Sequence, residues 1–185
     1  MVSTNNLKNG MTLEVDGALM DVVEFQHVKP GKGGAFVRTK LKNVESGKVL
    51  EKTFRAGEDV PQAIIRKREL QYLYREGDAI VLMDTETYDQ QYVPDEQVGE
   101  AIDYITEGDT LTLLDHEGRV VGVELPPSVT LEVTETQPGI AGNTVQNATK
   151  PATLETGVEV QVPLFIEEGE LIKVDTRTGE YMSRA

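Results

Sequence analysis

Residues 22–42 read VVEFQHV-KPGKGG-AFVRTKLK, two runs rich in strand-forming residues on either side of a Pro/Gly cluster. This arrangement predicts a β-hairpin that is closed by a loop of several residues. Pro30 fixes its own φ, and three glycines surround Lys32, so no adjacent side chain packs against that lysine. Lys32 is therefore expected at the tip of an arm, on a flexible stem. The simpler interpretation is an ordinary hairpin turn with a solubilising lysine.

The run that follows the loop alternates with a period of two, so its side chains divide between two faces of a strand. The face expected to be buried consists of Val37, Thr39 and Leu41. The other face carries three positive charges, on Arg38, Lys40 and Lys42. Such a row is either a solvated strand face or a set of contacts to phosphates.

Short strand signals separated by glycine turns continue along the whole chain. Asp16-Gly17 predicts a two-residue hairpin turn, and Ser46-Gly47 predicts a second turn. A Glu-Gly-Asp phrase followed by an apolar run begins at Glu76 and again at Glu107, and a shorter version begins at Glu168. The sequence therefore predicts an all-β fold built of several small barrels.

Three consecutive barrel domains are expected, at residues 1–64, 65–127 and 128–185, with Pro126-Pro127-Ser128 at the second boundary. One helix, from Pro94 to about Ile105, is predicted in the second domain by the helical spacing of its apolar residues.

Two features stand near the start of the second domain. The basic cluster at residues 66–68 either is a solvated linker or extends the basic face. Leu70, Tyr72 and Tyr74 alternate along one strand, which predicts that all three share a face and fill a core, although aromatic residues beside basic ones can also stack on bases.

Charge is distributed unevenly in a chain of 185 residues whose net charge is −14. Residues 1–75 contain 13 Lys/Arg and 9 Asp/Glu, whereas residues 76–149 contain one arginine and 16 acidic residues. This asymmetry indicates a polyanionic partner at the basic N-terminal end, where the Lys32 loop lies.

The chain has no cysteine, its first residues lack the apolar core of a signal peptide, and no apolar run is long enough to span a membrane. A cytoplasmic location is expected, with no membrane contact.

No arrangement of residues indicates catalysis, a cofactor or a metal. The two histidines, His27 and His116, are far apart in the sequence and have no cysteine near them, which argues against zinc. Residues 31–33 do not form a phosphate-binding Walker loop, because Gly33 follows the lysine where Ser or Thr is needed. Lys32 could act as a Schiff-base nucleophile only inside a desolvating pocket, and three glycines do not make one.

Two separated stretches carry a resemblance to a known family. Residues 28–38, together with Glu51-Lys52-Thr53-Phe54, resemble the first domain of bacterial elongation factor P. Residues 150–157 and the ending at 172–181 resemble that family's C-terminal signature, and Tyr72-Leu73-Tyr74 matches the start of its second domain. The resemblance runs from end to end. In the third domain relatives commonly carry Gly-Asp-Thr, whereas this chain has Asn143 at the aspartate's place, so contacts assigned to that aspartate need not hold.

The resemblance implies an SH3-like (KOW-like) domain and two OB-like domains in an L-shaped, tRNA-like arrangement. It implies a monomer that binds the ribosome, both rRNA and ribosomal proteins, beside the peptidyl-tRNA, and that relieves stalling at consecutive prolines. Lys32 would reach the peptidyl-transferase centre after extension by a lysine-modifying enzyme, held by loop residues Pro30, Gly31, Gly33 and Gly34. The candidate RNA contacts are Lys29, Arg38, Lys40, Lys42, Gly142, Asn143, Thr144 and Arg184.

Three alternatives remain at the level of sequence. One is a general single-stranded nucleic-acid-binding protein that uses its OB-like domains, which the net charge of −14 disfavours. Another is a specialised paralogue of elongation factor P. The third is an enzyme with Lys32 as its nucleophile.

Overall fold

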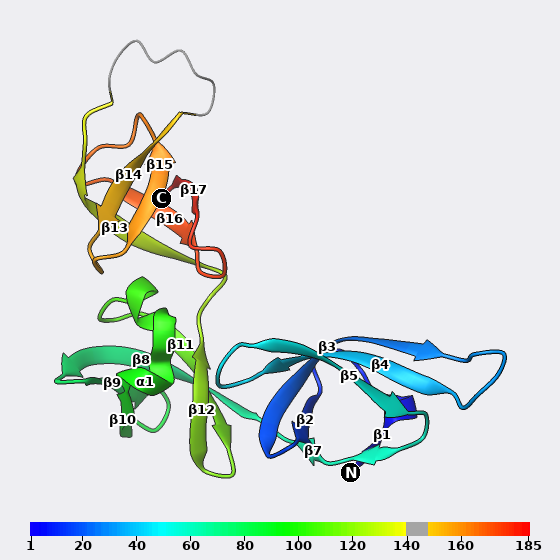
Figure 1. The fold of residues 1–185 in the computed structure, drawn as a ribbon. Coiled ribbons are helices and arrows are strands. Elements are labelled where there is room, and N and C mark those ends of the chain that lie inside the picture. Colours follow the sequence, from blue (N-terminus) through cyan, green and yellow to red (C-terminus); the bar gives the residue numbers. More distant parts are fainter. Residues whose placement is uncertain (140–147) are drawn as a thin grey trace. The chain divides into compact units, whose positions relative to one another are not determined.

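A computed structural model describes residues 1–139 and 148–185, and these form an all-β structure (Figure 1). The described residues contain three five-stranded antiparallel sheets and one two-stranded sheet. By their packing they divide into two compact units. One unit comprises Met1–Lys67 with Leu114–Gly122, and the other comprises Arg68–Leu113 with Val123–Ala185. No helix in the described part of the chain is long and apolar enough to cross a membrane.

The first sheet has the strand order β5-β4-β3-β2-β7. Its strands are β2 (Thr12–Val15), β3 (Ala18–Val28), β4 (Phe36–Asn43), β5 (Val49–Arg55) and β7 (Gln62–Ala63). A short 3₁₀ turn, η1 (Thr4–Asn6), follows β1 (Val2–Ser3), which pairs with β6 (Asp59–Val60). The predicted turn at Asp16-Gly17 is confirmed, because both residues have positive φ, 51° and 77°, as a tight two-residue hairpin turn requires.

The predicted face of β4 is confirmed as the core side of this sheet. Val37 and Leu41 are fully buried, and they pack in a cluster with Leu13, Val22 and Phe54. Thr39 lies between them at 1% exposure, and its hydroxyl donates to the Lys52 carbonyl at 2.6 Å. Burying this polar group is therefore tolerated, because its hydrogen bond is satisfied.

The tip of a later hairpin belongs to the same unit. Leu114 and Val121, from β11 (Thr110–His116) and β12 (Arg119–Glu124), are buried in one cluster with Leu19 and Ala63. The ring nitrogen Nδ1 of His116 lies 3.1 Å from the Ile64 carbonyl, and Arg119 forms an ion pair of 2.7 Å with Glu45. His116 therefore has a structural contact.

The second sheet has the order β10-β9-β8-β11-β12 and continues from β8 (Arg66–Glu76) through β9 (Ala79–Asp84) and β10 (Gln90–Pro94). The prediction that Leu70, Tyr72 and Tyr74 share a core face was wrong. The pairing register between β8 and β9 shifts between Tyr72 and Tyr74, and this bulge turns the later part of the strand over. Leu70 and Tyr72 are buried, whereas Tyr74 is 40% exposed.

The predicted helix over residues 94–105 is in the right place, but it is not continuous. An α-helical turn, α1 (Asp95–Val98), ends at Gly99, which has φ 61° and ψ −144°. A 3₁₀ helix, η2 (Gly99–Tyr104), completes the segment. Glycine adopts this backbone conformation readily, so a residue inside the apolar pattern became a helix end. Of the apolar residues in this segment, Val98 and Ile105 are buried, whereas Ala101 and Ile102 are half-buried.

The third sheet has the order β15-β14-β13-β16-β17. Its strands are β13 (Ser128–Thr136), β14 (Thr149–Leu154), β15 (Glu159–Pro163), β16 (Leu171–Asp175) and β17 (Tyr181–Arg184). The core of this sheet is an apolar cluster in which Leu131 and Val133 are fully buried with Ile172 and Val174.

Candidate functional site

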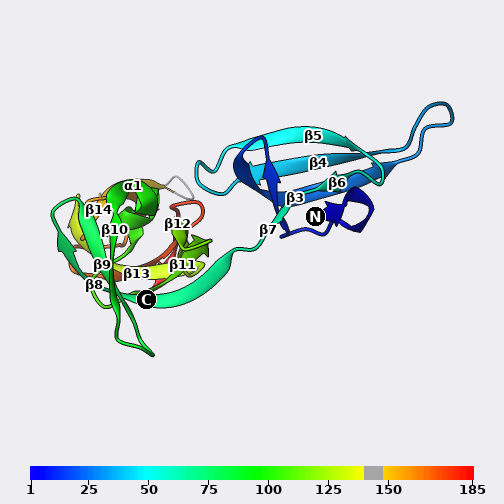
Figure 2. The same ribbon diagram turned by 90° about the horizontal axis from the view of Figure 1, so that it is seen from below.

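The loop that carries Lys32 joins β3 to β4, and the strands pair up to Val28 and Phe36 before they separate. Figure 2 shows this loop projecting beyond the rest of the first sheet. Residues 29–35 are all exposed. The two strands form a long hairpin because their β-branched and aromatic residues suit a pleated, half-buried surface. Lys29, Pro30 and Lys32 therefore lie at the end of an arm, as predicted.

The glycines of this loop differ in what they contribute to its shape. Gly33 has φ +106°, a conformation that other residues rarely adopt. Gly31 and Gly34 do not have such a φ, and a Cβ added at either would meet nothing within 4 Å. Of these three loop glycines, Gly33 alone is required by the backbone conformation. Gly31 and Gly34 keep the tip narrow, although no neighbouring atom would exclude a side chain there.

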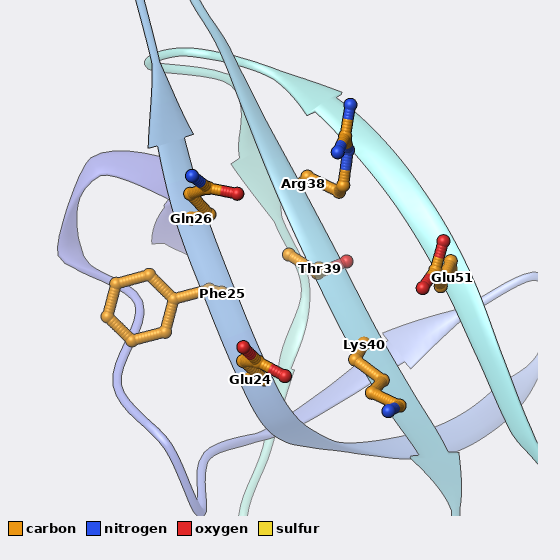
Figure 3. A pocket seen from close by; sticks show the side chains of 7 residues that line it. All are labelled: Glu24, Phe25, Gln26, Arg38, Thr39, Lys40 and Glu51. Carbon is orange, nitrogen blue, oxygen red and sulfur yellow. The ribbon is translucent and has the colours of Figure 1, made fainter.

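The basic row on β4 is exposed, as predicted, but it is not flanked by other basic residues. Lys40 lies opposite Glu24 of β3 on one side and opposite Glu51 of β5 on the other. Directly opposite side chains share a face and interact. Figure 3 shows the two carboxylates and Lys40 around a shallow depression with Arg38. The two carboxylates therefore partly offset the positive charge of Lys40.

Arg38 has a different environment, because its opposite residues are Gln26 and Thr53, both uncharged. Lys42 lies opposite Asp21 and Val49. Among the three cations of this row, Arg38 is the one without a carboxylate directly opposite. Nothing in the local sequence indicated this difference, because it depends on the register of three strands and on a bulge between Val22 and Glu24.

His27 lies on the same arm and is exposed. Its ring meets the Phe25 ring edge-on, with centroids 5.6 Å apart. Within the described ranges, no group of three or more His, Cys, Asp or Glu side chains could hold a metal ion.

The other predicted RNA contacts lie in the third sheet or beside it. The Arg184 guanidinium lies over the Phe165 ring at 4.6 Å from its centroid, donates to the Phe165 carbonyl at 3.3 Å and forms an ion pair of 3.1 Å with Glu170. Sequence reasoning missed Phe165 and Glu170, because neither is near Arg184 in the chain. Gly142, Asn143 and Thr144 lie outside the described residues.

Lys150 differs from the exposed lysines of the arm. It is only 7% exposed, and its ammonium donates to the Gln137 carbonyl at 2.5 Å. A buried ammonium of this kind needs such a partner. Lys150 thus joins β14 to the end of β13 and is not available as a surface cation.

Known protein families match the chain over each of its three five-stranded sheets. A family model described as "Elongation factor P (EF-P) KOW-like domain" matches residues 3–60, one described as "Elongation factor P (EF-P) OB domain" matches residues 65–123, and one described as "Elongation factor P, C-terminal" matches residues 129–184. The confirmed fold class is accordingly an all-β, three-domain architecture.

Similar proteins extend over the full chain. Elongation factor P of Acidothermus cellulolyticus is 60% identical over 100% of this chain and 99% of its own length. Elongation factor P of a Synechococcus strain is 56% identical over 100% of both chains. Among solved structures, a eukaryotic translation initiation factor 5A from Methanococcus jannaschii matches with a TM-score of 0.52 and 26% identity, over 66% of this chain and 92% of that one. The chain therefore belongs to the elongation factor P family of translation factors, which is homologous to initiation factor 5A.

Proposed function

We propose that this protein binds the ribosome beside the peptidyl-tRNA and promotes peptide-bond formation at consecutive prolines, with Lys32 reaching the peptidyl-transferase centre. The observation that carries this proposal is the narrow, exposed tip of the β3–β4 arm. Lys32 lies there between glycines, and Gly31 and Gly34 face open space. An arm of this shape can enter a confined RNA site with a single flexible cation in front.

Proline slows peptide-bond formation for a physical reason. Its ring fixes φ and adds bulk beside the reacting nitrogen, so the two substrates reach a reactive geometry less often. Holding two reactants in place can lower a barrier by about 7 kcal/mol or more in favourable cases. A cationic tip that orders the peptidyl-tRNA would supply part of this by positioning alone, without covalent catalysis.

Binding would come from contacts to phosphates. Arg38 is the strongest candidate on the arm, because no carboxylate lies directly opposite it, with Lys29, Lys40 and Lys42 as further contacts. Such contacts give affinity without sequence preference. Arg184 would add a contact from the third domain, and Gly142, Asn143 and Thr144 remain proposed contacts on the family resemblance. Within this proposal the domains are residues 1–64, 65–127 and 128–185.

Lys32 is also proposed as the substrate of a lysine-modifying enzyme. Its amine is accessible at the tip of the arm, and the flanking glycines would let an enzyme approach closely. An extension of the side chain would increase its reach beyond the loop. Peptide mass spectrometry of protein isolated from its native host would test this, and an unmodified Lys32 peptide there would contradict it.

The function is tested by a reconstituted translation system that synthesises a reporter with three consecutive prolines. Lys32→Ala should abolish relief of the stall while leaving ribosome binding largely intact. Lys48→Ala is the matched control, because Lys48 is an exposed lysine in the β4–β5 turn of the same sheet. Equal synthesis with Lys32→Ala and with the unchanged protein would refute the proposal.

A further inference from the structure

The second sheet carries two tyrosines in one row across three strands. Tyr74 of β8 and Tyr92 of β10 both lie opposite Val81 of β9, so the three side chains share a face. Val81 is 0% exposed, whereas Tyr74 is 40% and Tyr92 is 58% exposed. Two rings thus flank a buried valine and keep much of their own surface in solvent.

On β9 this row lies on the face opposite to that of Ile80 and Leu82. On the opposite face Ile80, Leu82 and Val93 are buried, as are Leu70 and Tyr72 before the bulge, whereas Arg75 at the strand end is exposed. The bulge between Tyr72 and Tyr74 brings Tyr74 to the face of Val81, where it joins Tyr92. A β-bulge re-aims a side chain and is frequent next to active sites, which favours a binding role for the exposed Tyr74 ring.

A carboxylate stands at the edge of the pair. Glu76 is two residues beyond Tyr74 on β8 and therefore lies on the same face in the next row. The pKa of Tyr92 is raised, first by the interaction of its phenol with the Glu76 carboxylate and then by that with the Tyr74 hydroxyl. The two rings and the carboxylate therefore lie near one another on one face of the sheet.

The charge around this group selects the kind of partner. Between Arg68 and Leu113 the chain has twelve acidic residues and two arginines. Arg75 is ion-paired with Asp95, and Arg68 donates to the Gln91 side chain at 2.9 Å. Surfaces that stack nucleic-acid bases combine aromatic rings with a basic groove for the backbone. The negative charge of this part of the chain repels phosphates and attracts a basic protein segment.

We propose that Tyr74, Tyr92 and Glu76 form a docking surface for an arginine-bearing segment of a basic protein. A guanidinium is planar, stacks on aromatic faces and donates to carboxylates in a fixed geometry, so one arginine can engage both rings and Glu76. A lysine ammonium engages such a group less well, because it is compact and strongly hydrated. These residues belong to a different compact unit from the Lys32 loop, and the inference does not depend on the role of that loop.

The test uses the full chain and two labelled twelve-residue peptides that differ only in carrying arginine or lysine between glycines, with binding measured by fluorescence anisotropy. The unchanged protein should bind the arginine peptide about fivefold more tightly than the lysine peptide, which corresponds to an exposed cation–π contact of about 1 kcal/mol. The double variant Tyr74→Leu/Tyr92→Leu should lose this preference. Tyr92→Phe should keep it, because the ring remains.

Tyr88→Asn is the matched control, since Tyr88 is an exposed tyrosine of the same domain in the turn after β9, and it should behave like the unchanged protein. Circular dichroism would establish that each variant is folded. Equal affinity for the two peptides, or an unchanged preference in the double variant, would show that overall acidity alone binds the peptides and would overturn the proposal. It would also be overturned if a twelve-nucleotide single-stranded RNA bound more tightly than the arginine peptide and lost that binding in the double variant. Lys32→Ala should leave every one of these affinities unchanged, so failure here is distinguishable from failure of the stall-relief proposal.

Discussion

A Cβ atom added at Gly179 would lie 2.7 Å from the hydroxyl oxygen of Tyr104. Gly179 is in the turn between β16 and β17 and has φ +72°, and Tyr104, at the end of η2, packs against the core cluster of the third sheet. The contact between these two residues thus joins η2, which follows the last strand-and-turn segment before β11, to the third sheet within one compact unit. Gly179 is needed both for its backbone conformation and for the space that Tyr104 occupies.

Gly179→Ala should therefore destabilise the protein by more than the cost of positive φ alone. That cost is about 1 to 2 kcal/mol for a residue with a side chain. Gly157→Ala isolates it, because Gly157 has φ +89° and a Cβ there meets nothing within 4 Å. Urea unfolding should show a larger decrease in the free energy of unfolding for Gly179→Ala than for Gly157→Ala.

Removing the Tyr104 hydroxyl should abolish this difference in stability. In the double variant Tyr104→Phe/Gly179→Ala the nearest atom is gone, and the ring carbon that carried it would lie 3.7 Å from the new Cβ. The decrease in the free energy of unfolding in the double variant should then approach that of Gly157→Ala. A double variant no more stable than Gly179→Ala would show that the steric account is incorrect.

The two central cations of the arm should differ in their contribution to ribosome binding. Arg38→Ala should reduce the slope of log affinity against log salt by about 0.7 to 0.9, the value for one phosphate contact. Lys40→Ala should change it less, because Glu24 and Glu51 lie opposite Lys40. Filter binding to ribosomes over a series of salt concentrations would measure both slopes.

Glu51→Gln provides the complementary variant. It removes one negative charge beside Lys40 and should tighten ribosome binding, most clearly at low salt where screening is weakest. If Lys40→Ala and Arg38→Ala gave the same slope, and Glu51→Gln had no effect, the pairing of the strands would not determine which cation meets phosphate.

Two of the positions where sequence and structure differ share a physical cause. The burial of Val37 and Leu41 followed from a period of two, which is a local property of the chain. The exposure of Tyr74 depends on a bulge, and the neighbours of Lys40 depend on register, and both are set by pairing between strands distant in sequence. The helix end at Gly99 has a different, local cause, because glycine readily adopts the positive φ found there.

Acid should weaken the turn after β16. The Asp175 carboxylate accepts from the backbone N–H groups of Arg177 at 2.8 Å and of Thr178 at 3.2 Å. The hydrogen bond from the Arg177 backbone, followed by that from its side chain, lowers the pKa of Asp175 below its usual 3.8. A depressed pKa contributes stability that is present above the unfolded value and lost as pH falls through the folded one.

Asp175→Ala should therefore be less stable than the unchanged protein at pH 7, and the difference should narrow as the pH falls below about 4, where unfolded aspartate protonates. Asp175→Asn should be the milder change, because its side-chain oxygen can still accept from the two N–H groups. Urea unfolding at pH 7 and pH 3 would measure this, and a difference that stayed constant with pH would exclude a role for the charge.

Replacing the loop glycines should separate folding from function. Gly31→Ala and Gly34→Ala should leave the melting temperature unchanged, because a Cβ at either position meets nothing within 4 Å. Both should nevertheless reduce relief of a polyproline stall, because each widens a tip that we propose enters a confined site. Gly33→Ala should alter the loop itself, because Gly33 has φ +106°. Thermal melts and reporter synthesis would be measured together for the three variants, and full activity of Gly31→Ala and Gly34→Ala would mean that the width of the tip does not limit its access.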